Sequence, residues 1–153
     1  MKYGMETRKI SEEELKTLNG EEDLRGANLL GANLNFRNFE RANFRHADLR
    51  GADLNEAVLE RANFHDADLR GADLEKAHLC GASFMRADLR GAQLYGADIS
   101  RVNFNDADLR GADLRGVTFD VASWTNTFLT GAFMDKKSAE KIGATLNEGG
   151  MVI

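Results

Sequence analysis

The five-residue segment ADLRG stands at residues 47–51, and three identical copies follow it at intervals of 20 residues. The later copies stand at residues 67–71, 87–91 and 107–111. Related segments fill every interval. When the large apolar residue of each segment is taken as its centre, 20 centres follow one another without interruption from Leu24 to Phe119. The residue two positions before a centre is almost always alanine. The chain therefore carries two nested periods, of five and of 20 residues.

A period of five residues fits neither an α-helix nor a plain β-strand. On a helix, successive centres would lie about 140° apart, so they would spread over all faces without forming an apolar stripe. A strand alternates with a period of two, which does not divide five. The pattern fits a short extended piece in which the alanine and the centre both point inward, followed by a corner where the recurrent glycine allows a tight turn. Repetition of this unit predicts an all-β solenoid.

The 20-residue period predicts four sides, because four five-residue segments then make one coil. Grouping centres that lie one such period apart separates them by type: side 1 carries Leu24, Phe44, Phe64, Phe84, Phe104 and Trp124; side 2 carries Leu29, Leu49, Leu69, Leu89, Leu109 and Leu129; side 3 carries Leu34, Leu54, Leu74, Leu94 and Leu114; side 4 carries Phe39, Leu59, Leu79, Ile99 and Phe119. An aromatic column beside two leucine columns requires contact between residues i and i+20. The predicted core includes Phe44, Phe64, Phe84, Phe104, Leu49, Leu69, Leu89 and Leu109. At ~4.8 Å per coil, five to six coils form a rod about 25–30 Å long.

These segments resemble the pentapeptide-repeat family, whose units follow the pattern A(D/N)LxX. Units such as ANLLG, ANFRH, ADLNE and ADLEK carry the resemblance, which covers the chain from Leu24 to Met134. It implies a right-handed quadrilateral parallel β-helix. Arg37 departs from the pattern, because a charged side chain is costly at an inward alanine position. Together with the neighbouring Phe36, it predicts a local bulge or opening of the coil.

Both ends of the solenoid need caps, because they expose unpaired strand edges. We expect a flank with a capping helix over residues 1–23, the β-helix over 24–134, and a C-terminal helix and tail over 135–153. Ser11 and Glu14 form a capping-box pattern, which predicts a helix over 11–18 that stops at Asn19-Gly20.

The C-terminal end allows two interpretations. A helix is predicted over 136–146, with Ala139, Ile142 and Leu146 on one side. The tail NEGGMVI either forms a packed or frayed terminus or makes a homodimer contact through Met151, Val152 and Ile153. The resemblance supports the second interpretation, since dimerisation through C-terminal elements belongs to the gyrase-protecting members of the family.

Composition favours a cytoplasmic protein without membrane contact. The formal net charge is −5, which argues against direct nucleic-acid binding. The single Cys80 excludes an internal disulfide framework. No apolar run reaches the length of a signal peptide or of a membrane span.

The chain offers little for catalysis, and we expect no enzyme, no cofactor and no metal site. His46, His65 and His78 all occupy outward positions, and His46 lies one coil from Asp66. A metal or acid–base role is conceivable for that group, but solvated surface side chains are the favoured interpretation. Cys80 also points outward, and no phosphate-binding glycine loop is present.

Side 2 carries two charged rows on its outer surface. The acidic row consists of Asp48, Asp68, Asp88 and Asp108, and the basic row of Arg50, Arg70, Arg90 and Arg110. Each row alone would repel itself, whereas side by side the two rows pair. We favour a mutually neutralising lattice that holds the register. The alternative is an interaction face that meets a partner with matching charge.

We expect a rigid protein-interaction or scaffold module whose partner is an unidentified protein. The alternative, suggested by the resemblance, is a DNA mimic that modulates an enzyme such as gyrase. Mimicry needs a strongly negative rod, yet residues 24–134 hold 15 acidic and 13 basic residues. The nearly neutral rod therefore favours the scaffold.

Overall fold

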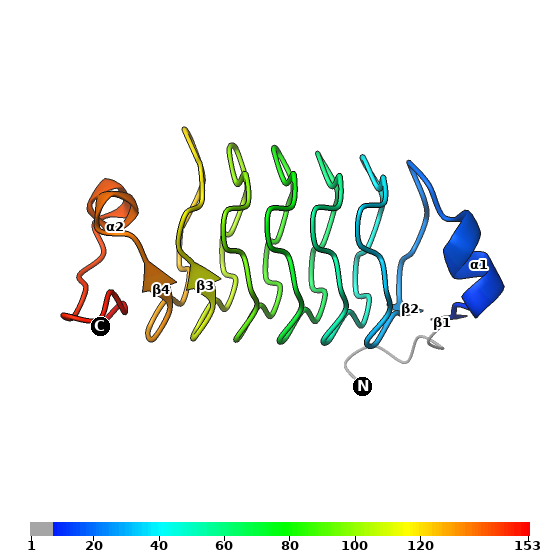
Figure 1. The fold of residues 1–153 in the computed structure, drawn as a ribbon, viewed down its shortest axis with the longest axis horizontal. Helices are drawn as coiled ribbons and strands as arrows, with labels where there is room; N and C mark the ends of the chain where they lie inside the picture. Colours follow the sequence, from blue (N-terminus) through cyan, green and yellow to red (C-terminus); the bar gives the residue numbers. More distant parts are fainter. Residues whose placement is uncertain (1–7) are drawn as a thin grey trace.

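The protein is a straight rod of stacked coils with one short helix at each end (Figure 1). The computed structural model describes residues 8–153, so residues 1–7 of the predicted flank lie outside the described residues. The helices are α1 (Glu12–Thr17) and α2 (Lys136–Ile142), and the strands are β1 (Arg8–Lys9), β2 (Ala27–Asn28), β3 (Asp113–Leu114) and β4 (Phe133–Met134). Between these strands the coils are joined by isolated parallel bridges.

Each coil pairs in parallel with the next, so that residue i lies beside residue i+20. Bridges join Asp48 to Asp68 and Asp68 to Asp88, and the same register holds on all four sides. The Leu69 N–H donates to the Asp88 C=O at 2.7 Å, and the Asp88 N–H donates to the Ala67 C=O at 3.0 Å. The predicted four-sided coil, with residues i and i+20 in contact, is confirmed.

The aromatic rings of side 1 stack on one another along the rod axis. Ring centroids lie 4.8 Å apart between Phe44 and Phe64 and 4.6 Å apart between Phe64 and Phe84, with nearly parallel planes. Phe104 and Trp124 continue the stack at 5.4 Å and 4.8 Å. The structure buries the four phenylalanines completely, and it also buries Leu49, Leu69, Leu89 and Leu109 of side 2. Inward alanines fill the remaining space, so the interior is a continuous apolar column.

The corners between Gly26 and Gly131 each have one residue at positive φ, except the corner at Val121. In one such turn the Ala72 N–H donates to the Leu69 C=O at 3.0 Å, and Gly71 has φ of 64°. Glycine is not required at every corner, because 11 non-glycine residues adopt the same region among the described residues. Arg41, with φ of 58°, and Asp66, with φ of 59°, are examples. The inter-coil hydrogen bonds therefore impose the corner conformation even on side chains that disfavour it.

Gly71→Ala tests how much a glycine corner contributes. We expect a loss of about 1–2 kcal/mol of unfolding free energy, because an L-residue at this φ is strained. An added Cβ meets nothing within 4 Å, so steric contact does not contribute. Urea unfolding measures the loss, and Gly149→Ala, at a glycine without positive φ, is the control. Equal stability of the two variants would contradict the backbone explanation.

The N-terminal end is closed by α1 and by β1. Ser11 caps α1, since its Oγ accepts a hydrogen bond from the Glu14 N–H at 3.1 Å, which is one half of the predicted capping box. The Glu14 carboxylate pairs with Arg8. The parallel strand β1 lies on β2 and extends the first coil, a pairing that the sequence did not predict.

Arg37 does not produce the predicted bulge. The register continues through it, since the Val58 N–H donates to the Arg37 C=O at 2.9 Å. Its guanidinium donates to the Leu15 C=O in α1 at the end of the rod. The prediction was wrong because the first coil has no coil above this position, so a charged side chain can leave the core toward α1.

The C-terminal helix is shorter than predicted. α2 ends at Ile142 instead of continuing to 146, because Gly143 adopts a left-handed conformation with φ of 73° and terminates it. The tail then turns back, and Val152 exchanges hydrogen bonds with the last coil, to the Ala132 C=O at 2.7 Å and from the Gly131 N–H at 2.8 Å. Val152 is buried, so this part of the tail packs on its own chain.

Candidate interaction surface

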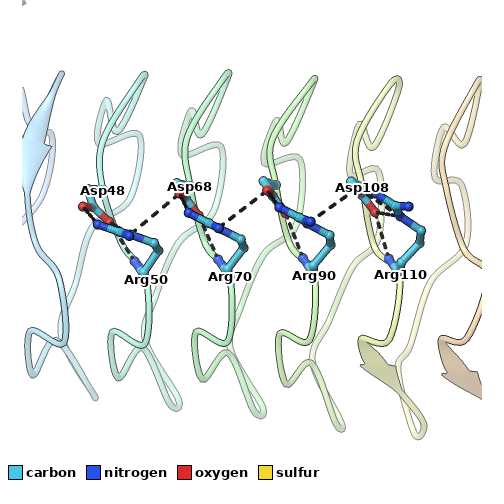
Figure 2. A network of polar contacts seen from close by, with 8 residues as sticks. Asp48, Arg50, Asp68, Arg70, Arg90, Asp108 and Arg110 are labelled. Atoms are coloured by element: carbon cyan, nitrogen blue, oxygen red, sulfur yellow. Dashed lines mark hydrogen bonds and ion pairs between the residues drawn. The ribbon is translucent and has the colours of Figure 1, made fainter. Parts of the chain in front are cut away.

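The two charged rows of side 2 form one lattice (Figure 2). Arg70 donates from Nε to Oδ1 of Asp68 at 2.8 Å and from Nη2 to Oδ2 at 2.6 Å. Its backbone N–H also donates to the same Oδ1 at 3.3 Å. The three other pairs, Asp48–Arg50, Asp88–Arg90 and Asp108–Arg110, repeat this geometry. The structure thus brings all eight residues of the candidate face together as bidentate pairs.

The lattice also connects neighbouring coils. Arg70 Nε lies 3.7 Å from Oδ2 of Asp88, and Arg50 and Arg90 make the equivalent contact with the next coil. At the last coil, Phe128 replaces aspartate, and the Arg110 guanidinium lies 6.0 Å from the centre of its ring. Because each arginine is already paired, the lattice has few charges left for a partner, which favours its role in holding the register.

Pairing stabilises the ionised carboxylates of the lattice. The side-chain hydrogen bond from Arg50 lowers the pKa of Asp48, and Arg110 lowers that of Asp108 in the same way. On side 3, Arg115 lowers the pKa of Asp113 by its side-chain hydrogen bond. Partial burial opposes these shifts but does not reverse them.

We expect the rod to lose stability in acid through these carboxylates. Because their folded pKa values lie below the unfolded value, their contribution is complete above about pH 4 and is lost as pH falls through the folded values. Thermal unfolding between pH 7 and pH 2 measures the loss. The triple variant Asp48→Asn, Asp108→Asn, Asp113→Asn should show a shallower acid decline than the wild type. Parallel pH profiles for the two proteins would contradict this assignment.

The uncharged residues at the same position of side 1 have a structural role. The Oδ1 of Asn63 accepts the backbone N–H of His65 at 3.0 Å, and that of Asn103 accepts the N–H of Asn105 at 2.9 Å. Asn43 binds the Arg45 N–H at 3.3 Å. The Asp or Asn before each centre thus closes a local side-chain turn before the corner. This bond explains why the repeat unit prefers these two residue types.

Two of the three histidines, His46 and His65, lie near one carboxylate. Asp66 Oδ2 lies 2.6 Å from Arg86 Nη2, 3.0 Å from His65 Nε2 and 3.7 Å from His46 Nδ1. Burial lowers the pKa of His65, and the charge of Asp66 opposes this effect. Within residues 8–153 no group of three or more His, Cys, Asp or Glu side chains is arranged to hold a metal ion. Arg86 instead occupies the carboxylate with a bidentate pair.

Side 1 carries positive charge that the sequence interpretation missed. In residues 41–120, its segments 41–45, 61–65, 81–85 and 101–105 contain four arginines and no carboxylate. The corresponding segments of side 3 and of side 4 each contain four acidic residues and one basic residue. We call Arg41, Arg45, Arg61, His65 and Arg101 the basic strip. A charge count over the whole rod conceals this difference between the sides. The difference becomes visible when the charged residues are assigned to the four sides.

The family model for pentapeptide repeats matches the chain in eight copies, over residues 23–53, 38–75 and 62–101. Together the matches span residues 23–101, more than half of the chain. The chain belongs to the pentapeptide-repeat family. Like its relatives, it is a right-handed quadrilateral β-helix, as the sequence predicted. A comparison with curated proteins finds no match.

Solved pentapeptide-repeat proteins resemble the chain. Rfr23 from the cyanobacterium Cyanothece 51142 is 31% identical, with a TM-score of 0.50 and 63% of each chain covered. HetL from Nostoc sp. strain PCC 7120, a protein involved in heterocyst differentiation regulation, is 33% identical over 76% of this chain and 63% of its own, with a TM-score of 0.44. Trypsin-treated QnrB1, a plasmid-mediated fluoroquinolone resistance protein, is 18% identical over 79% of this chain and 86% of its own, with a TM-score of 0.39. The chain thus spans 63% of the length of Rfr23 and of HetL.

No helix within residues 8–153 has the length and apolar character that a membrane span requires. The two helices have six and seven residues, whereas crossing the hydrocarbon core takes about 20.

Proposed function

We propose that this pentapeptide-repeat protein is a non-enzymatic, rigid module that binds or organises another protein. The observation that supports this proposal is the fixed register of its sides. Parallel bridges between residues i and i+20 on all four sides hold the outward side chains in rows. A partner that binds such rows orders little backbone, so little conformational entropy opposes association.

The proposal extends to the compartment and to the assembly. A reducing cytoplasm suits the free thiol of Cys80. A homodimer contact through the C-terminal segment would use Ile153, which is exposed, rather than Val152, which is buried in its own chain. Sedimentation over a range of protein concentrations tests this contact. A wild-type monomer at all concentrations would contradict it.

Affinity capture from the native host tests the scaffold function. The tagged full-length protein should retain a partner, and the purified partner should bind the purified rod with defined stoichiometry in a titration. The variant Ala77→Arg, which is expected to unfold, is the control for non-specific capture. Absence of any partner that binds directly after purification would contradict the proposal.

A second candidate function is mimicry of DNA toward an enzyme such as gyrase. It is supported by the acidic excess on the adjacent sides 3 and 4. Lys76 and Arg115 interrupt this acidic surface, and Arg115 neutralises Asp113, which lies 2.6 Å away. The interrupted negative charge makes mimicry of DNA the less favoured of the two functions. A supercoiling assay with added protein tests it: inhibition would favour mimicry, and unchanged supercoiling at a large excess of protein would exclude it.

A further inference from the structure

We propose that the basic strip of side 1 binds an acidic segment of a partner polypeptide. This inference rests on the proposed interaction function and specifies its surface and the chemistry of its partner. The strip lies beside the charge lattice of side 2. The segments of side 1 between residues 41 and 120 contain no carboxylate, whereas segment 21–25 at the N-terminal end of that side contains Glu21, Glu22 and Asp23.

The arginines of the strip differ from those of the lattice in how they are paired. Among residues 8–153, Arg45, Arg61 and Arg101 form no ion pair, whereas Arg70 is held by a bidentate pair with Asp68. The Arg61 Cγ lies 3.4 Å from the place where a Cβ on Gly81 would be, so this side chain extends along the rod. Arg41, the remaining arginine of the strip, is already paired, since it lies 3.0 Å from Glu21 and 3.7 Å from Glu40. The charges of Arg45, Arg61 and Arg101 are therefore available for carboxylates of a partner, since guanidinium and carboxylate form two parallel hydrogen bonds.

The centre of the strip, between its two edges, carries hydrogen-bond donors. The Oδ1 atoms of Asn43, Asn63 and Asn103 already accept backbone N–H groups. Their amide NH₂ groups remain as donors. A surface with guanidinium groups at its edges and amide donors in its centre is complementary to oxygen acceptors and offers little to a cationic partner.

The extent of the strip favours a short peptide over a nucleic acid. Its segments are five residues wide, about 13–16 Å, and its coils stack at ~4.8 Å, so it accommodates about four to six extended residues. A longer polyanion would extend over sides 2 and 4, which carry carboxylates such as Asp66 and Glu60. The acidic net charge of −5 also disfavours a nucleic acid.

Fluorescence anisotropy with a labelled hexaglutamate peptide tests the inference on the full-length protein. The wild type should bind, and Kd should rise with added salt because the contacts are ionic. The triple variant Arg45→Gln, Arg61→Gln, Arg101→Gln should raise Kd about tenfold, as expected for three lost surface ion pairs. A labelled hexathymidylate should bind the wild type more weakly than hexaglutamate.

A second triple variant, Arg70→Gln, Arg90→Gln, Arg110→Gln, removes the same number of charges from side 2. It should change Kd less than about threefold, since its arginines are paired within the rod. Circular dichroism verifies that both variants fold. An equal rise in Kd for both variants would mean that binding depends on net charge alone. Tighter binding of hexathymidylate than of hexaglutamate would mean that the strip binds nucleic acid. Absence of hexaglutamate binding by the wild type would mean that the strip is not a binding site. Each of these results overturns the inference.

The two proposals fail separately. If host capture yields a direct partner that the strip variant still binds with wild-type affinity, the scaffold function holds and the inference about the strip is wrong. If no direct partner is found but the strip discriminates hexaglutamate as expected, the scaffold function fails while the acidic-peptide chemistry of side 1 is supported.

Discussion

Replacing Phe84 by alanine is expected to lower the free energy of unfolding by about 3–5 kcal/mol. The ring is fully buried, and its centroid lies 4.6 Å from that of Phe64 and 5.4 Å from that of Phe104. Its removal leaves a cavity between the rings of Phe64 and Phe104. Because inter-coil hydrogen bonds fix the spacing of the coils, the neighbouring coils cannot move together to fill this cavity. We therefore expect a loss in the upper half of this range.

Urea unfolding of Phe84→Ala and Arg90→Ala measures the contrast between inward and outward positions. Arg90 is exposed and paired with Asp88 at the surface, so its truncation should lower stability by less than about 1 kcal/mol. Phe84→Leu, which retains most of the apolar volume, should lie between the two. Equal and small effects at Phe84 and Arg90 would mean that the assignment of inward and outward positions is wrong.

Ala77→Arg is expected to have the second large effect and to unfold a substantial fraction of the protein. Ala77 is fully buried and lies two coils from Arg37 in the same inward column. An arginine there would be an unpaired buried charge, which lowers stability by about 3–5 kcal/mol, and its volume adds strain. Arg37 escapes this penalty because it lies at the end of the rod and reaches the Leu15 C=O.

Ala77→Met separates volume from charge in this experiment. Overpacking alone should lower stability by about 1–3 kcal/mol, so the methionine variant should retain the near-native circular dichroism spectrum that the arginine variant loses. Thermal unfolding monitored by circular dichroism gives both values. Equal stability of the arginine and methionine variants would show that the column is open to solvent at this position.

The sequence predicted the interior of the rod well, because its two periods encode the interior directly. The aromatic column of side 1 and the leucine column of side 2 require contact between coils, and the structure stacks Phe64 on Phe84 accordingly. The two ends of the rod were predicted less well, since their structure depends on which segment packs against the terminal coil. The contact of Arg37 with α1, the pairing of β1 with β2 and the return of the tail to Ala132 all depend on tertiary placement.

The candidate site shows a similar division. The Asp and Arg rows of side 2 were predicted as a mutually neutralising lattice, and the structure brings Asp68 and Arg70 together as a bidentate pair. The basic strip of side 1 was missed although its signal lies in the segments RANFR at 41–45 and RANFH at 61–65. Counting charge over the whole rod hid it, whereas the register between residues i and i+20 assigns each charge to a side.

Hydrogen-bond scalar couplings measured by NMR test the central claim, the register between residues i and i+20, most directly. The structure predicts a coupling between the Leu69 N–H and the Asp88 carbonyl, and another between the Asp88 N–H and the Ala67 carbonyl. Repetition of both couplings in each coil along the rod would establish four five-residue segments per coil. Couplings that instead join each side to a segment three or five units along the chain would contradict it. The coil would then have three or five sides, and every assignment of charge to a side would change.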